Sequence, residues 1–417
     1  MRAVVISMLT SMRRLAILLF PGCVLLLAGL VQLRTGVLPD AWRPYVHAFP
    51  YLVGGVGLLL GCYFHRSRIV FALVLLAVAE VTLRGIGDQH ANPGSVGRFV
   101  YAALAVLLPM NLVVCAVRKE RGLFTNHGQT RFGLMAIQLI AVGALIRLEW
   151  APATEWLEAA YLGGRLAGWT ELPDAAVATF GAAIALLAGR CVLRRDPIEA
   201  GCLWAVVSGG IALHGLRWGW APTPLLGTAG LTLIWALLAT TYRMAYTDEL
   251  TDLPGRRALD EALLRVGSRF TLAMVDVDHF KRFNDLFGHE VGDQALRMVA
   301  TKLSRVEGGG KAFRYGGEEF ALLFAGASLD DAMPHLEAVR HVIADSHFVV
   351  RASDRPRKKP TTPRAPRGPH VAVSLTVSIG AAERGGRKGL TDPHDVLRAA
   401  DKALYRAKRA GRNRLMA

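Results

Sequence analysis

Two glycines precede two adjacent carboxylates in the segment RYGGEEF, residues 314–320. Apolar runs flank this segment, KAF before it and ALLFA after it, and both are typical of buried strands. Paired glycines between two such runs predict a tight hairpin turn, because glycine adopts a positive φ at both central positions without steric cost. The sequence therefore places Glu318 and Glu319 at a hairpin tip, either as solvated turn residues or as part of a site.

A third carboxylate gives these acids a partner. The run TLAMVDV, residues 271–277, predicts a buried strand with Asp276 at its end. If this strand lies beside the hairpin, Asp276 and Glu318 converge and repel each other unless a divalent cation lies between them. Oxygen ligands and phosphate chemistry favour magnesium, so the acids predict a Mg²⁺ site. The alternative for Asp276 alone is an acid that caps the turn after its strand.

The elements that must position these acids predict one α/β domain over residues 244–417. Strand and helix patterns alternate over about 170 residues, a usual size for a single core. The segment 376–382 predicts another strand, and a final helix is predicted over 392–411. Lys281 follows the first strand, and Lys408 and Arg412 crowd the end of the final helix. Without further context, such cations are ordinarily solvated charges.

Five motifs together identify a family for this domain. They are DELTDLPGRRAL from Asp248, DVDHFKRFNDLFGHEVGD from Asp276, RYGGEEF from Arg314, LTVSIGAA from Leu375 and ADKALYRAKRAGRN from Ala400. In this order they cover nearly the whole domain, which resembles the GGDEF-domain diguanylate cyclases. The resemblance implies a nucleotidyl-cyclase-like α/β (α+β) fold with a central, mostly antiparallel sheet. It also implies that a homodimer condenses two GTP molecules into cyclic di-GMP and releases two pyrophosphates.

The resemblance assigns a metal site and a general base. Asp276, the carbonyl of Val277 and Glu318 are similar to the family's magnesium ligands, with Mn²⁺ as an alternative ion. The attacking 3′-hydroxyl needs a general base, and the motif leaves Glu318 and Glu319 as the two candidates.

The resemblance also assigns contacts to the nucleotide. Asn284 and Asp293 match the positions that hydrogen-bond the guanine edge. Lys281, Lys408 and Arg412 match the cations that contact phosphate. The backbone of Gly316 and Gly317 is expected to pass close to the nucleotide.

Two stretches depart from the family pattern. Many members carry an Arg-x-x-Asp motif for product inhibition shortly before the hairpin, but residues 307–310 here read EGGG. The segment 351–370 is rich in Arg, Lys and Pro, and it predicts a disordered surface loop between two strands, with membrane-surface contact as the alternative.

Residues 1–243 have a different character. The chain has a mean hydropathy of +0.32 and 52% hydrophobic residues, which is high for a soluble protein. Eight apolar runs are about long enough to cross a bilayer: 15–33, 48–64, 69–83, 98–117, 131–148, 174–193, 201–217 and 223–242. They predict an α-helical membrane bundle of about eight spans. Seven or nine spans are alternatives, because the third and seventh runs contain Glu80 and His214.

The basic loops predict how the bundle is oriented. The segments 65–68, 118–121 and 194–196 fall on the same side as Arg13 and Arg14, and short cytoplasmic loops carry the positive excess. An even number of spans then places the cyclase domain in the cytoplasm, as in a multi-pass protein of a bacterial inner membrane. The net charge of +16 is explained largely by loops that face anionic membrane lipid, so no nucleic-acid partner is expected.

Three functions compete at this stage. The first is a membrane-bound diguanylate cyclase whose N-terminal half is a sensor. The second is a catalytically weak domain that binds GTP and acts as a receptor or scaffold. The third is a transporter with an appended cyclase, for which the few charges inside the predicted spans give little support. The intact acids, guanine contacts and phosphate cations favour the enzyme.

Overall fold

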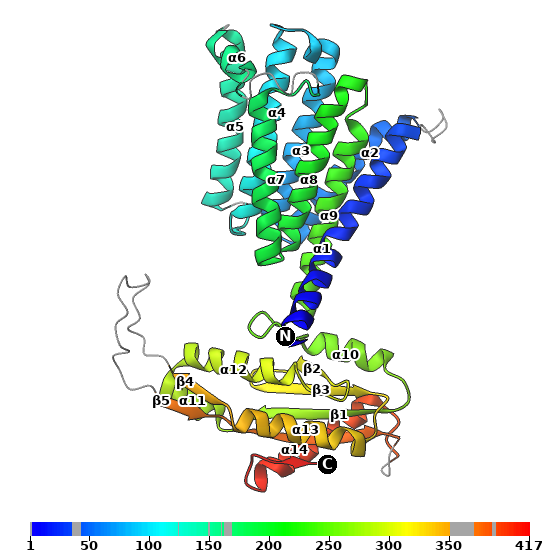
Figure 1. Ribbon diagram of the computed structural model, residues 1–417, viewed down its shortest axis with the longest axis vertical. Coiled ribbons are helices and arrows are strands. Elements are labelled where there is room, and N and C mark those ends of the chain that lie inside the picture. The colour runs from blue at the N-terminus through cyan, green and yellow to red at the C-terminus, as the bar shows by residue number, and fades with distance from the viewer. Residues whose placement is uncertain are drawn as a thin grey trace. The chain divides into compact units, whose positions relative to one another are not determined.

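The computed structural model describes residues 2–35, 43–123, 125–148, 151–159, 161, 169–350, 371–385 and 389–417. The chain divides into two compact units, Met1–Thr241 and Tyr242–Ala417. The expected boundary, between residues 243 and 244, lies two residues further along the chain. Figure 1 shows helices throughout the first unit and a sheet covered by helices in the second.

The N-terminal unit is α-helical in its described residues. Its α-helices are α1 (Arg2–Thr35), α2 (Arg43–Tyr63), α3 (Ser67–Ile86), α4 (Val96–Val117), α5 (Asn126–Arg147), α6 (Ala151–Glu158), α7 (Asp174–Arg194), α8 (Pro197–Gly215) and α9 (Thr223–Tyr246). Two 3₁₀ helices, η2 (Gly87–Ala91) and η3 (Leu216–Trp218), extend α3 and α8. Each of the eight predicted apolar runs falls on one long helix, and the short α6 is additional.

Six of these helices are long and apolar enough to cross a membrane, namely those at 67–91, 96–117, 128–147, 174–194, 197–218 and 223–246. The apolar parts of α1 and α2 are shorter, Leu15–Val31 and Ala48–Tyr63. The expectation of about eight spans is therefore met in part, by six candidate spans among the described residues. α1 and α2 each contain a proline, Pro21 and Pro50.

Polar caps fix several of these helix ends. Ser95 accepts a hydrogen bond from the backbone N–H of Arg98 at 3.0 Å, which begins α4. The Asp196 carboxylate accepts one from the N–H of Ile198 at 3.0 Å, and Pro197 occupies the first turn of α8, where its missing N–H costs nothing.

The C-terminal unit is built on a five-stranded sheet with the order β2-β3-β1-β6-β7. Its strands are β1 (Phe270–Val277), β2 (Lys311–Arg314), β3 (Glu319–Ala325), β6 (Val377–Arg384) and β7 (Leu415–Met416). The pairs β1-β3, β1-β6 and β2-β3 are antiparallel, and β6-β7 is parallel. The expected mostly antiparallel central sheet is therefore present.

Helices cover both faces of this sheet, because successive side chains of β1 point to opposite faces. Ala273, Val275 and Val277 pack with α11 (Phe280–Phe287), α12 (His289–Leu303) and α13 (Leu329–Ala344). Leu272 and Met274 pack with α10 (Arg256–Arg265) and α14 (Pro393–Arg409). Every residue of β1 is buried, as its continuous apolar run predicts.

One glycine lets the last helix lie directly on the sheet. A Cβ atom at Gly380 in β6 would stand 1.9 Å from the backbone nitrogen of Leu404 and 2.3 Å from the carbonyl oxygen of Ala400. No side chain fits there, so α14 approaches β6 at backbone distance. Because α14 lies so close to the sheet, its residue Lys408 lies near the C-terminal end of β1.

The predicted hairpin is present, but the reason given for its glycines is wrong. β2 and β3 pair antiparallel, with Arg314 opposite Phe320. Neither Gly316 nor Gly317 is among the glycines with a positive φ in the described chain, so this is not a primed turn. Instead, the backbone N–H groups of Tyr315 and Gly316 donate to the Glu319 carbonyl at 2.9 and 3.2 Å. A tip of four residues is therefore closed by ordinary backbone hydrogen bonds.

A second, two-stranded sheet pairs β4 (His347–Val350) with β5 (Val371–Ser374). These strands flank the basic segment 351–370, as the sequence predicted for a connection between two strands. The segment itself lies outside the described residues.

Candidate active site

The sheet register brings the predicted acids together. Asp276 in the central strand β1 lies opposite Glu319 of β3 and Ser378 of β6. Glu318 immediately precedes β3, and its carbonyl accepts a hydrogen bond from the N–H of Val277 at 3.3 Å. Asp276 is only 5% exposed, whereas Glu318 and Glu319 are partly exposed. The antiparallel pairing of β1 with β3 therefore produces the convergence that the two motifs predicted separately.

The electrostatics of the two acids reflect that convergence. Burial raises the pKa of Glu318, and the negative charge of Asp276 raises it further. Burial also raises the pKa of Asp276, against the opposing effects of Lys408 and, more weakly, Arg412. Two partly desolvated carboxylates near each other are costly in the ionised state, and a bound cation relieves that cost.

The last helix supplies cations to this cluster. The Nζ atom of Lys408 lies 2.8 Å from Oδ2 of Asp276. Arg412 follows α14 and lowers the pKa of the same carboxylate. The structure therefore groups Asp276, Glu318, Glu319, Lys408 and Arg412. In this structure Lys408 contacts a predicted metal ligand, although the resemblance assigns it to phosphate.

The predicted guanine contacts form a second group on α11 and α12. Asn284 is partly buried, and its Oδ1 atom has no hydrogen-bond partner in the described chain. A Cβ atom at Gly292, in the first turns of α12, would stand 1.9 Å from this oxygen, so Asn284 lies against Gly292, and the exposed Asp293 is the next residue of α12. A buried acceptor without a partner is costly unless a ligand satisfies it. Lys281 is exposed on α11, and the contacts within the described chain do not tie it to either group.

Asp278, the second acid of the motif DVD, was not predicted as a site residue. It is 5% exposed and accepts hydrogen bonds from the hydroxyls of Thr376 and Ser378, both at 2.7 Å, and from the N–H of Asn413 at 3.0 Å. Asp278 therefore joins the ends of β1 and β6 to the turn after α14. The only signal in the sequence was its position two residues after Asp276.

Arg340 of α13 binds the same turn, the one that follows α14. It is 7% exposed, forms an ion pair with Glu337 at 2.6 Å and donates to the carbonyl and the side-chain oxygen of Asn413 at 3.1 and 2.5 Å. Arg412 and Asn413 both have positive φ angles, 60° and 46°, an uncommon conformation for residues other than glycine. Asp278 and Arg340 thus hold the turn that presents Arg412.

Arg314 braces the hairpin tip. Its guanidinium donates to the Asp248 carboxylate at 2.6 Å and to the carbonyls of Gly317 and Gly316 at 2.7 and 3.3 Å. Burial raises the pKa of Asp248, but hydrogen bonds from Thr251 and Arg314 outweigh it, so the net pKa is lowered. A pocket of about 410 Å³ lies here, lined by residues that include Asp248, Arg314 and both tip glycines. Gly317 has open space where a side chain would begin.

Fold and site together define an α/β domain with a carboxylate cluster at the hairpin end of its sheet. Residues 245–362 match the family model described as "Diguanylate cyclase, GGDEF domain". The C-terminal part of this chain is therefore a GGDEF domain, and the resemblance seen in its motifs is confirmed.

Several known proteins are similar to this part of the chain. The diguanylate cyclase DgcP of Pseudomonas aeruginosa is 38% identical over 179 residues, which cover 41% of this chain and 24% of DgcP. The diguanylate cyclase VdcA of Vibrio cholerae is 38% identical over 183 residues, 43% of this chain and 49% of VdcA. This chain thus spans less than half the length of either relative. The solved coiled coil and GGDEF domain of DgcB from Caulobacter crescentus, in complex with c-di-GMP, is 36% identical, with a TM-score of 0.36, over 43% of this chain and 89% of that one.

Proposed function

We propose that the C-terminal unit is an active diguanylate cyclase that condenses two GTP molecules into cyclic di-GMP. The observation that carries the proposal is the convergence of Asp276 and Glu318 in a domain that matches the GGDEF family. In the balanced reaction, each 3′-oxygen attacks the α-phosphorus of the other GTP and each bond from the α-phosphorus to the pyrophosphate breaks. Two pyrophosphates leave, and each hydroxyl proton passes to a base.

The donor set fits magnesium. Among the described residues, no group of three or more His, Cys, Asp or Glu side chains is arranged to hold a metal. The proposed set has two carboxylates, Asp276 and Glu318, and the carbonyl of Val277, all hard oxygen ligands of the kind that Mg²⁺ binds together with substrate phosphates. The pKa values of both acids are raised, and a nearby cation would stabilise their ionised forms. When bound, Mg²⁺ (or Mn²⁺) would neutralise charge on the phosphate oxygens.

The chain's own residues divide the remaining work. Lys408 and Arg412 stand at the acid cluster and are placed to share their charge with the triphosphate. Asn284 offers its unpartnered oxygen to the guanine N–H groups, with Asp293 beside it. Glu319, directly opposite Asp276, and Glu318 remain the two candidates for the base. Because each GTP supplies the nucleophile for the other, two copies of the domain must face each other, and we propose a catalytic homodimer.

The test is whether the purified full chain converts GTP and Mg²⁺ to cyclic di-GMP. Product formation supports the enzyme. Tight GTP binding by the wild-type chain without any product would instead support the receptor or scaffold.

We also propose that the N-terminal unit spans the cytoplasmic membrane and acts as a sensor, with the cyclase in the cytoplasm. The six candidate spans and the basic loops support this placement. Glu80 is 1% exposed and accepts from Arg84 at 2.6 Å and from Thr223 at 2.7 Å, so it is held in an ion pair. His214 contacts the hydroxyl of Thr170 at 2.9 Å. Both ionisable groups thus have structural partners, and neither favours the transporter alternative. Recovery of the chain in an alkali-washed membrane fraction tests the placement, and release as a soluble protein contradicts it.

A further inference from the structure

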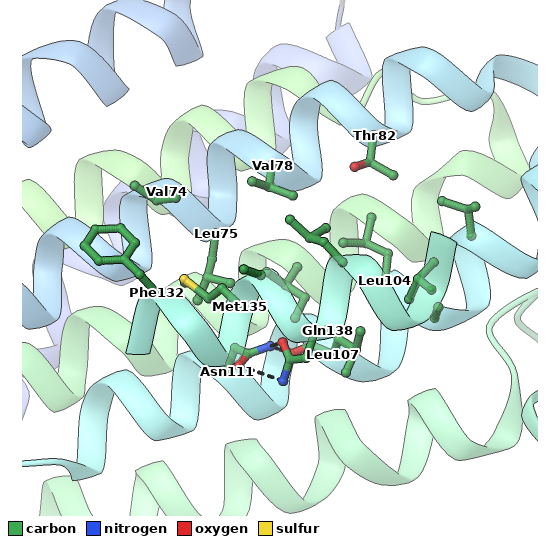
Figure 2. Close-up of a pocket in the computed structure, with 16 residues that line it drawn as sticks. Val74, Leu75, Val78, Thr82, Leu104, Leu107, Asn111, Phe132, Met135 and Gln138 are labelled. Atoms are coloured by element: carbon green, nitrogen blue, oxygen red, sulfur yellow. Dashed lines mark hydrogen bonds between the residues drawn. The ribbon is translucent and has the colours of Figure 1, made fainter. Parts of the chain in front are cut away.

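The helices α3, α4 and α5 of the N-terminal unit line a pocket of about 330 Å³ (Figure 2). Its walls are apolar side chains from all three helices, including Val74 and Val78 of α3, Leu104 of α4 and Phe132 and Met135 of α5. The 16 lining residues include no charged side chain. A volume near 330 Å³ falls within the range of roughly 300–1,000 Å³ that is usual for small-molecule sites.

The hydroxyl of Thr82 and one pair of amides interrupt this apolar wall. Asn111 is 7% exposed and donates from Nδ2 to the carbonyl of Leu107 at 2.9 Å and to Oε1 of Gln138 at 2.8 Å. Gln138 donates from Nε2 to Oδ1 of Asn111 at 3.4 Å. Figure 2 shows the two amides joined by dashed lines among the apolar residues. After these bonds, Gln138 retains one N–H donor and one lone pair on its oxygen.

The pair alone would be an ordinary bond between two helices in a membrane. However, only 6% of the apolar stretch of α5 is buried inside the structure, whereas 50% of that of α3 and 61% of that of α4 are buried. The pair therefore bridges α4 to a loosely packed helix, next to an open apolar volume. A molecule in that volume would contact all three helices and bury the inner face of α5.

We propose that this pocket binds a neutral lipophilic molecule that carries one carbonyl or hydroxyl oxygen. The apolar lining accommodates the body of the molecule, and the remaining N–H of Gln138 donates to its oxygen, while the lone pair of Gln138 can accept from the O–H of a hydroxyl. A charged head group is disfavoured, because the lining offers it no counter-charge and burial of an unpaired charge is costly. A plain hydrocarbon chain leaves the hydrogen-bonding capacity of Gln138 unused. The proposal rests on the proposed membrane location and names the ligand class of the proposed sensor.

Photolabelling of the full chain in phosphatidylcholine vesicles tests the site. The probe is a long-chain alcohol with a diazirine group, and labelled residues are mapped by mass spectrometry. We expect saturable labelling on α3, α4 and α5, with competition by the unlabelled alcohol and weaker competition by the matching alkane and carboxylate. Gln138→Leu should remove the preference for alcohol over alkane while labelling persists.

Variants that fill the pocket provide the control. Ala136→Phe should lower labelling roughly tenfold, which corresponds to about 1.4 kcal/mol of lost binding free energy. Leu139→Trp is a second filling variant at an exposed position, and Ala185→Phe on the exposed face of α7 is the matched control that should leave labelling unchanged.

Labelling that does not saturate, that spreads evenly over all helices, or that survives in both filling variants overturns the proposal. Labelling in detergent that disappears in vesicles overturns it too, because phospholipid chains then occupy the pocket. Saturable labelling without formation of cyclic di-GMP supports the pocket and contradicts the proposed enzyme, so the two failures are distinguishable.

Discussion

The carboxylate of Glu318 is proposed to bind the metal, and its replacement by an amide tests this role without removing a core side chain. We expect Glu318→Gln to lower turnover by more than roughly a hundredfold, since loss of a partner in the outer shell of a metal site alone costs 10–100-fold. The shape of the side chain is kept, so the fold should persist. Turnover is measured with GTP and Mg²⁺, with Glu307→Gln as an exposed control outside the acid cluster. Retention of near wild-type turnover would remove Glu318 from the site.

The same variant has a pH signature in the absence of metal. An acid whose pKa is raised in the folded protein is destabilising while it is ionised, and this penalty disappears as the pH falls through its folded pKa. For Glu318 that window begins above its ordinary value of 4.5. Without metal at neutral pH, Glu318→Gln should therefore slow hydrogen exchange in β1 and β3, and the difference should vanish below about pH 4.

Asn284 carries the prediction about base recognition. Its unpartnered oxygen leaves a hydrogen-bonding deficit that guanine would fill. We expect Asn284→Ala to raise the apparent GTP requirement and to lower the preference for GTP over ATP by roughly a hundredfold, because sites that hydrogen-bond a substrate group reject analogues that lack it. Competition between the two nucleotides in initial-rate assays measures this. Unchanged discrimination against ATP would show that Asn284 does not bind the guanine base.

Asp278 acts through the turn that holds Arg412. Its two oxygens accept from three donors, so an Asn at this position turns an amide group toward at least one of them. We expect Asp278→Asn to raise the apparent KM for GTP roughly tenfold. Asp401→Asn on the exposed face of α14 is the control. A loss of stability with unchanged KM in the protein that remains folded would give Asp278 a structural role only.

Two acids that the structure brings together, Asp276 and Glu318, could be named from the sequence, whereas the residues that hold the neighbouring turn could not. Asp276 and Glu318 stand out because acids next to buried strands are unusual, and the strand register then brings them together. Arg340 could not be found in this way, because its contact with Asn413 joins residues 73 positions apart and neither type is unusual on a surface. The contact between Lys408 and Asp276 was likewise not foreseen.

At the scale of elements, the turn before β2 bears on regulation. Gly308 and Gly309 have positive φ angles of 70° and 76°, and a Cβ atom at Gly310 would stand 2.6 Å from the buried ring of Phe324. The turn therefore fits EGGG and resists an acid at its last position. We expect weak product inhibition, because neither the Arg nor the Asp of the family motif is present. Cyclic di-GMP titrated into initial-rate assays measures this, and potent non-competitive inhibition would reveal another inhibitory site.

The hairpin shows how an element can be predicted correctly for the wrong reason. Two apolar runs around Gly-Gly indicated the turn, and the strands pair as expected. The glycines do not supply positive φ angles, because Arg314 and the Glu319 carbonyl hold the tip in another conformation. Glycine instead leaves open space at residue 317, where a nucleotide would approach. The conformation of the tip depends on hydrogen bonds among residues 314–319 and on the contact of Arg314 with Asp248, 66 positions away, and the pattern of apolar runs and glycines reveals neither.

At the scale of the whole molecule, hydropathy located every long helix of the N-terminal unit, but not the number of spans. Apolar runs and helices agree because a membrane helix needs about 20 apolar residues in sequence. Six candidate spans meet this requirement among the described residues, and the described apolar stretches of α1 and α2 cover only 15–31 and 48–63. The polar pair Asn111–Gln138 joins α4 to α5 across 27 residues of sequence, a contact that hydropathy cannot report.

The measurement that tests the central claim most directly is the stoichiometry of turnover by the purified full chain with GTP and Mg²⁺. The proposed reaction predicts cyclic di-GMP and two pyrophosphates per product, no reaction after the divalent ion is chelated, and turnover lowered by more than roughly a hundredfold in Glu318→Gln. Release of inorganic phosphate and GDP, or binding of GTP with no pyrophosphate from the wild-type chain, would contradict it.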